Sequence, residues 1–189
     1  MRTAVRTTYL ELLHPGALRP APRPAECELV RAEVPSPELN RFFYTAVGSE
    51  WYWHDRLRWS WAEWQALLSR EGYQTWFALC RGTPAGYFEL DLTRPPDAEV
   101  AYFGLLPSFT GRGIGGWLLS QAADQGFAAG AGRVWLHTCS LDHPAALANY
   151  LARGFTVFRE DQREIELPDL LREPWPGARR PGRVAEEVG

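Results

Sequence analysis

The chain has 189 residues, 46% of them hydrophobic, which is enough to enclose one sizeable apolar core. Its formal net charge is −3 and all 20 basic residues are arginine. This argues against a basic nucleic-acid-binding face and excludes a P-loop, whose phosphate contacts need a lysine. No apolar run approaches the ~18 residues of a membrane span, and the first residues lack the apolar stretch of a signal peptide.

The first half of the chain predicts two strands and a helix. Strands are expected at 7–13 and 26–34, separated by the proline-rich connector 19–24. A helix should follow Pro35, with Ser36 as its N-cap and Gly48 at its end.

A second helix is expected after a block of five tryptophans that falls between residues 51 and 64. Ser60 and Glu63 have the spacing of a capping box at its start. We expect most of these tryptophans to pack in the core.

The second half predicts strands that alternate with two helices. The strands are expected at 73–80, 84–92, 97–106 and 133–139, with two final strands at 155–161 and 163–167. The helices run from the glycine-rich segment to about Ala129, and over 143–154. The resulting order, ββααβββαβαββ, predicts an α/β fold with a mixed sheet.

The three cysteines, Cys27, Cys80 and Cys139, are far apart and lack the spacing of metal ligands. We therefore expect free thiols in a reducing compartment, a cytoplasmic location and no metal site. Neither nucleic acid nor membrane is an expected partner, and the oligomeric state is open, a homodimer included.

Residues 110–120, TGRGIGGWLLS, place four glycines where a helix should begin. Glycine lets backbone approach a ligand closely, and a helix N-terminus offers unpaired N–H groups to an anion, so the segment predicts a phosphate cradle. Residues 111–116 also satisfy G-x-G-x-x-G. A dinucleotide-binding unit, however, needs the glycines directly after a strand and an acidic residue about 20 positions later, and both are missing. A glycine-rich turn without a ligand is the other alternative.

The stretch YFGLLPSFTGRGIGGWLL, followed after a strand by DHPAALANYLARGF, resembles the GNAT superfamily of N-acetyltransferases. The family motif Q/R-x-x-G-x-G/A falls on residues 110–115, with Thr110 in place of Gln or Arg. A helical tyrosine four residues before Gly-Phe is matched by Tyr150. The resemblance covers about 73–160 well. It implies a mostly antiparallel central sheet flanked by helices, and we expect one domain over 1–168 with a loosely held tail at 169–189.

The resemblance also implies acetyl-CoA as co-substrate and a set of residues that hold it. The loop that takes the pyrophosphate comprises Thr110, Gly111, Arg112, Gly113, Ile114, Gly115 and Gly116. The pantetheine arm and the oxyanion fall to the main chain of Phe103, Gly104 and Leu105, where Gly104 also suggests a bulge or a close approach of the ligand. His143 stands where the family often has asparagine, and is either a cofactor contact or a polar residue at a helix start.

Acetyl transfer to an amine needs a proton acceptor, oxyanion donors and a proton donor for the leaving thiolate. Glu99, 14 residues before Gly113, has the spacing at which some members of the family that this chain resembles carry a catalytic glutamate. It is therefore the expected base, and a solvated carboxylate at a strand end is the alternative. Glu89 and Asp91 are held in reserve. Tyr150 is the expected acid, because a phenol with a pKa of about 10 stays protonated at neutral pH.

The family places the connection between the first two helices over the acceptor, so Trp51, His54 and Asp55, with Glu89, are expected to bind the amine. Asn149 and His137 are interpreted as structural residues. We predict an N-acetyltransferase that moves acetyl from acetyl-CoA to a primary amine of a small molecule, peptide or protein, by direct attack in a ternary complex. A non-catalytic CoA or acyl-CoA sensor is the main alternative, and a nucleotide-dependent oxidoreductase is a more distant one.

Overall fold

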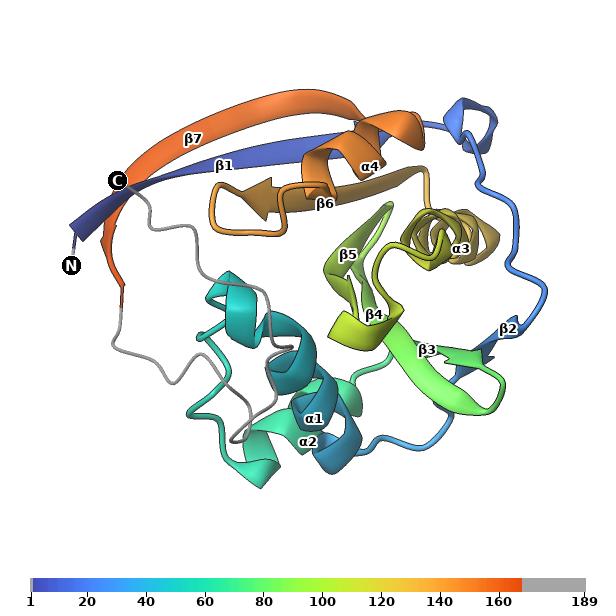
Figure 1. Ribbon diagram of the computed structural model, residues 1–189, viewed down its shortest axis with the longest axis horizontal. Helices are drawn as coiled ribbons and strands as arrows, with labels where there is room; N and C mark the ends of the chain where they lie inside the picture. The colour runs from blue at the N-terminus through green and yellow to red at the C-terminus, as the bar shows by residue number, and fades with distance from the viewer. Residues whose placement is uncertain (1, 168–189) are drawn as a thin grey trace.

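The computed structural model describes residues 2–167, which build one seven-stranded sheet with helices on both faces (Figure 1). The strands are Arg2–Leu12 (β1), Cys27–Arg31 (β2), Tyr73–Cys80 (β3), Thr83–Arg94 (β4), Asp97–Leu105 (β5), Arg133–Cys139 (β6) and Thr156–Glu166 (β7). The helices are Pro37–Gly48 (α1), Trp61–Leu68 (α2), Ile114–Ala128 (α3) and Ala146–Ala152 (α4), with short 3₁₀ turns at Pro15–Ala17 (η1), Ser49–Trp51 (η2) and Pro107–Phe109 (η3). The predicted order is confirmed except at its end, where one strand replaces the two expected.

The strands lie in the order β2-β3-β4-β5-β6-β1-β7. Neighbours are antiparallel apart from β5 and β6, which run parallel, so the sheet is mixed and mostly antiparallel as predicted. The N-terminal strand β1 lies between β6 and β7, and it runs beside β7 along the whole upper edge in Figure 1.

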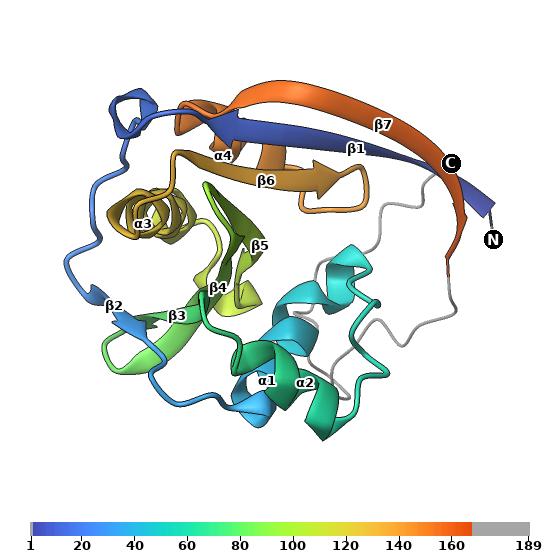
Figure 2. The ribbon, with the colours of Figure 1, turned by 180° about the vertical axis from the view of Figure 1, so that it is seen from behind.

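The helices cover the sheet from both sides (Figure 2). On one face, α3 buries Trp117, Leu118 and Ala122 in the main core, against residues such as Leu90 and Leu136. On the other face, α1 and α2 form a layer in which Phe43 packs on Phe77 and Tyr87. Both layers are rich in aromatic and branched side chains, whose burial supplies most of the stability of such a fold.

The capping and turn residues predicted from the sequence lie at the ends of these helices and strands. The Ser36 hydroxyl accepts a hydrogen bond from the Leu39 amide, and Ser60 with Glu63 completes a capping box at the start of α2. The β3–β4 hairpin turns through Arg81 and Gly82, at φ 53° and 77°. Two successive positive φ angles are those of a type I′ turn, whose twist suits a hairpin.

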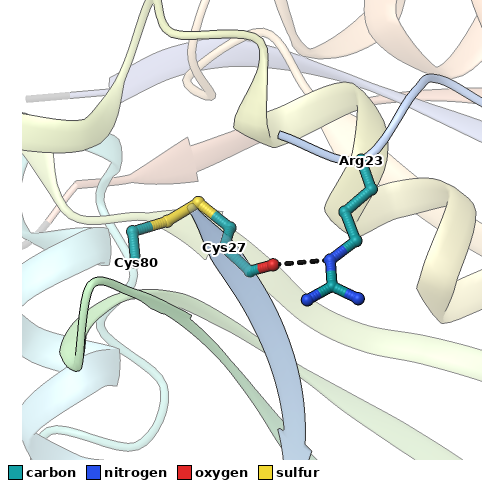
Figure 3. Close-up of a disulfide and its surroundings, with 3 residues drawn as sticks. All are labelled: Arg23, Cys27 and Cys80. Carbon is teal, nitrogen blue, oxygen red and sulfur yellow. Dashed lines mark hydrogen bonds between the residues drawn. A yellow bond between two sulfur atoms is a disulfide. The ribbon is translucent and has the colours of Figure 1, made fainter. Parts of the chain in front are cut away.

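The expectation of three free thiols is wrong for two of them. Cys27 on β2 and Cys80 on β3 are directly opposite in the antiparallel ladder and form a disulfide, with Cα atoms 4.1 Å apart (Figure 3). Arg23 holds the chain before β2 by donating its Nε–H to the Cys27 carbonyl at 2.6 Å (Figure 3). The two cysteines are 53 residues apart in sequence, and only the strand register brings them together. Cys139 is free.

No helix between residues 2 and 167 is long and apolar enough to cross a membrane. The predicted domain end at 168 and the tail 169–189 lie outside the described residues.

The disulfide should contribute about 2–4 kcal/mol to the free energy of unfolding, because it closes a long loop in the unfolded chain. Reductant should therefore lower the unfolding midpoint of the parent protein, and Cys27→Ala/Cys80→Ala should have a low midpoint that no longer responds to reductant. Cys139→Ala is the matched control and should respond as the parent does. Equal midpoints for the parent with and without reductant, after oxidation in air, would contradict the assignment.

Candidate active site

The parallel strands β5 and β6 pair over only three residues each. Residues 97–99 of β5 face residues 133–135 of β6, after which the strands diverge, although β5 continues to Leu105 and β6 to Cys139. A bulge helps β5 to bend away, because Glu89 and Leu90 of β4 face Tyr102 and Val100 and leave Ala101 without a partner. The divergence opens a wedge in the middle of the sheet.

A cavity of about 1180 Å³ occupies this wedge. It extends to the glycine-rich loop before α3 and to the connection between α1 and α2. Most residues that the sequence singled out line it. They are Trp51, His54, Asp55, Glu99, Phe103, Gly104, Leu105, Thr110, Gly111, Gly113, Gly115, Gly116, His143 and Tyr150. Glu89, Arg112 and Ile114 are not among its lining residues.

The glycine-rich loop presents an open backbone at this cavity. Gly111 and Gly113 have φ angles of 74° and 76°, which side-chain-bearing residues rarely adopt, and Gly113 is the N-cap of α3. A Cβ at either position would meet no protein atom within 4 Å. The 15-residue helix α3 therefore begins beside unfilled space. The N-terminus of a helix is a favourable position for an anion.

Two other glycines lie close against neighbouring side chains. A Cβ on Gly116 would lie 2.6 Å from Arg153 Nη1, and one on Gly104 would lie 2.4 Å from Val47 Cγ1 of α1. Val47 of α1 thus packs closely on Gly104, which also lines the cavity, and the bulge of β5 lies at Ala101 and not at this glycine. Ile114 is 3% exposed and belongs to the core beneath the loop.

Glu99 is the last residue of β5 that pairs with β6, so its side chain stands where the wedge opens. Burial raises its pKa to about 6, and the charge of Asp91 adds to this, whereas Arg94 and Arg56 oppose it. A carboxyl that titrates this close to neutrality can accept and release a proton at working pH. His137 Nδ1 of β6 lies 4.0 Å from Glu99 Oε1.

Tyr150 comes from α4 and is 7% exposed, with its ring edge-on to Phe103 at 6.3 Å between centroids. Burial raises the pKa of its phenol, and nearby Asp142 and Cys139 raise it further, so the hydroxyl stays protonated as a donor. Asn149 Nδ2 donates to the Gly115 carbonyl at 3.4 Å and lines the cavity. It therefore ties α4 to the first turn of α3. Helical spacing correctly predicts that Asn149 and Tyr150 point in different directions. It does not reveal that α3 lies on the side of α4 that carries Asn149.

The opposite end of the cavity is formed by the connection between α1 and α2. His54 Nδ1 lies 2.7 Å from the Tyr52 carbonyl and His54 Nε2 lies 3.5 Å from Asp55 Oδ1. The Trp51 ring meets the His143 ring at 5.0 Å. His143 Nδ1 also accepts the Ala145 amide at 3.0 Å, which agrees with the expected alternative of a polar residue at a helix start.

Two sequence interpretations differ from the structure. Glu89 was expected at the acceptor or as a reserve base, yet it is fully buried and receives hydrogen bonds from Arg56, Tyr73 and Asn40. Two of these partners, Arg56 and Tyr73, line the cavity, whereas Glu89 does not. His137 was interpreted as a satisfied strand histidine, but its side chain is 45% exposed and lines the cavity, because the divergence of the strands uncovers it.

The fold and the cavity together define a class of acyltransferase, with a sheet that parts between two parallel strands and a glycine-rich helix start at the opening. Residues 37–155, more than half of the chain, match the model of the acetyltransferase (GNAT) family. The chain therefore belongs to the GNAT acetyltransferase family, whose members transfer acetyl groups and use acetyl-CoA. No curated protein matches the sequence. Within residues 2–167, no three His, Cys, Asp or Glu side chains gather closely enough to hold a metal ion.

Similar solved structures include two GCN5-related N-acetyltransferases. The protein from Kribbella flavida is 21% identical with a TM-score of 0.60, over 82% of this chain and 56% of that one. The protein from Sphaerobacter thermophilus is 17% identical with a TM-score of 0.60, over 85% and 52%. The ribosomal-protein-S18-alanine N-acetyltransferase from Escherichia coli is 18% identical with a TM-score of 0.54, over 69% and 77%. At these identities the likeness concerns the fold, and the chain spans little more than half the length of the first two proteins.

Replacing Glu99 by Gln should stabilise the protein at neutral pH. The Glu99 pKa rises from 4.5 to about 6 on folding, so the unfolded chain ionises first and stability falls as pH rises through this window. The loss amounts to about 1–2 kcal/mol and is complete above pH ~7. Urea unfolding should show Glu99→Gln more stable than the parent at pH 7.5, with the gain vanishing near pH 4.

Glu38→Gln is the control for this measurement. Glu38 is exposed, and hydrogen bonds from its own backbone and from Trp61 lower its pKa. Its ionised form is therefore favoured in the folded state, and its replacement should give no stabilisation at pH 7.5. A Glu99→Gln variant that is no more stable than the parent at pH 7.5 would contradict the raised pKa.

Proposed function

We propose that the protein is an N-acetyltransferase that transfers acetyl from acetyl-CoA to a primary amine by direct attack in a ternary complex. One observation carries this proposal: Glu99 and Tyr150 face a single cavity that also reaches the open glycine loop. The cavity thus offers its bound molecules Glu99, which can accept a proton near neutral pH, and Tyr150, which remains protonated.

Acetyl-CoA would bind along the wedge. The first turn of α3 offers its unpaired N–H groups to the pyrophosphate, over residues 110–116. Beyond Glu99, β5 has no ladder partner on its β6 side, so the main chain at 103–105 is free to hydrogen-bond the pantetheine amides. Ile114 supports the loop from the core, and Arg112 stacks on Phe109 outside the cavity lining, with its guanidinium 5.4 Å from the ring centroid.

The proposed reaction uses the two named side chains in turn. Glu99 accepts a proton from the ammonium form of the acceptor, and the neutral amine attacks the thioester carbonyl carbon. A C–N bond forms and the C–S bond breaks as the tetrahedral intermediate collapses. Tyr150 donates its proton to the leaving thiolate, and the proton that the new amide nitrogen loses restores the phenol. The net products are the acetamide, CoA and one proton.

The acceptor would enter from the side of the α1–α2 connection. Trp51 supplies an aromatic wall, His54 a polar edge and Asp55 a negative charge for a protonated amine. Small-molecule, peptide and protein amines all remain in the proposed substrate class.

A cytoplasmic location remains a prediction from the sequence. It was partly inferred from free thiols, and the Cys27–Cys80 disulfide removes two of the three. Disulfides persist mainly in oxidising compartments, so the thiol state of the protein isolated from cells without reductant is a direct test.

The glycine loop can be tested by a matched pair of substitutions. Gly113→Val places a branched side chain at a positive φ and in the open space of the cradle, and should weaken acetyl-CoA binding by about a hundredfold in calorimetry. Gly82→Val should bind within about threefold of the parent, because Gly82 has a similar positive φ and open surroundings but does not line the cavity. Equal dissociation constants for Gly113→Val and the parent would remove the cradle assignment.

Proton transfer can be tested by kcat/KM profiles between about pH 6 and 10. In the parent, kcat/KM should rise as Glu99 ionises near pH 6. Glu99→Gln should lower it by roughly 10²–10⁴-fold, with a deficit that shrinks as free amine becomes abundant at high pH. Tyr150→Phe should lower turnover and leave acetyl-CoA binding unchanged.

Tyr87→Phe is the control for Tyr150→Phe, because Tyr87 is a buried tyrosine that lies outside the cavity lining. Its kinetics should match the parent. An unchanged profile for Glu99→Gln would move the base to Asp91 or a bound water. Tight CoA binding without turnover of any amine would favour the sensor alternative.

A further inference from the structure

The connection between α1 and α2, residues 52–60, forms the acceptor-side wall of the cavity, and we call it the acceptor loop. Its first anchor is Trp53. The Trp53 side chain lies so close to α1 that a Cβ on Gly48 would be 2.4 Å from it, and its ring contacts Tyr102 at 4.9 Å and Tyr44 at 5.6 Å. This anchor is apolar and fixes the start of the loop.

The second anchor is Arg56, whose side chain is only 10% exposed. Its Nη1 donates to Glu89 Oε2 of β4 at 2.6 Å, and its Nη2 donates to the Tyr73 hydroxyl of β3 at 3.2 Å. Aromatic rings surround the guanidinium, and its central carbon lies 4.3 Å from the Tyr102 ring and 4.9 Å from the Trp59 ring. Burial disfavours the charged form of Arg56, but Glu89 and Tyr73 raise its pKa, so it remains a cation.

Glu89 is held as firmly as the arginine. It is fully buried, accepts a hydrogen bond from Asn40 Nδ2 of α1 at 2.9 Å, and is also hydrogen-bonded by the Tyr73 hydroxyl. The pair therefore joins the loop to β3, β4 and α1 at one point. A buried ion pair adds little net stability compared with an apolar contact of the same volume, but it tolerates few alternative arrangements. Its effect here is to define one position of the loop.

His54 and Asp55 lie between the two anchors and line the cavity. Glu99 of β5 and His137 of β6 line the same cavity, with Glu99 Oε1 4.0 Å from His137 Nδ1. The loop thus brings the Asp55 carboxylate to the cavity that Glu99 faces.

We propose that Arg56 is the positioning residue for the acceptor: its buried pair with Glu89 holds the acceptor loop so that Asp55 and His54 face the amine. The role of the loop in acceptor binding rests on the proposed function, whereas its anchoring by Arg56 does not. Arg56 also lines the cavity, but its assigned role is to act through the loop and not in the chemical step. Its loss should therefore change the acceptor KM far more than kcat or acetyl-CoA binding.

The test compares three variants with the full-length parent. Arg56→Met/Glu89→Gln removes both charges together, so that no unpaired charge is left in the core. Arg56→Lys keeps the charge but loses the two-pronged contact with Glu89 and Tyr73. Leu12→Ala is the stability control, because it removes a buried side chain of β1 that belongs to the main core and does not line the cavity.

Two measurements are made on each protein. Amide hydrogen exchange over 52–60 reports the anchoring without requiring any activity. Exchange over 52–60 should quicken by about tenfold or more in the double variant, less in Arg56→Lys, and no more than in the rest of the protein in Leu12→Ala. The acceptor KM should rise by about tenfold in the double variant, with kcat and the acetyl-CoA Kd within about twofold of the parent.

Exchange over 52–60 that stays as slow as in the parent would overturn the anchoring role. Faster exchange with an unchanged acceptor KM would overturn the link to the acceptor. If the parent acetylates no amine, the proposed function fails and the acceptor role fails with it, while the exchange data alone still decide whether Arg56 anchors the loop.

Discussion

The early parting of β5 and β6 is the constraint on which the rest of the structure depends. A strand inside a sheet normally satisfies its N–H and C=O groups on both sides, but β5 has a β6 ladder over residues 97–99 only. The remainder of β5 keeps its β4 ladder and exposes the other edge to an internal cavity. The first turn of α3, the helix α4 and the acceptor loop all meet at this edge. A polar edge inside a folded protein is well suited to hold an extended amide-bearing ligand.

The two sides of the cavity are stabilised in different ways. On the α3 side the backbone is open, and the supporting contacts are apolar ones from the core under Ile114. On the α1–α2 side the support is a buried ion pair, Arg56–Glu89, surrounded by aromatic rings. Glu99 stands between them, and its burial there disfavours its own charge. Apolar side chains of the same volume as Glu89 and Glu99 would make the protein more stable than these carboxylates do. Such a loss of stability is common at functional sites.

Local patterns made much of this structure predictable. The caps at Ser36 and Ser60, the β3–β4 hairpin and the glycine-rich start of α3 depend on neighbouring residues, and each was found where the sequence indicated. The family resemblance then supplied the sheet type and a set of residues that line the cavity. Features that depend on register or on distant elements were missed. The disulfide joins two cysteines that are 53 residues apart, and it depends on the register of the two strands that carry them. The burial of Glu89 depends on its partner Arg56 and on a bulge in β5, and the alternation of residues along a strand reveals neither.

The position of β1 bears on how this chain reaches its native state. β1 is synthesised well before β6 and β7, yet it pairs with both and lies between them, for example Thr7 opposite Cys139 and Asp161. Those contacts close loops of more than 100 residues. The entropy cost of closing these loops must be overcome late, because β6 and β7 follow α3 and most of the sheet in the chain. During translation β1 is an unpaired strand with two free edges, which is a hazard for aggregation. The part of the sheet that bounds the cavity on the β6 side therefore depends on contacts between segments that are far apart in the sequence.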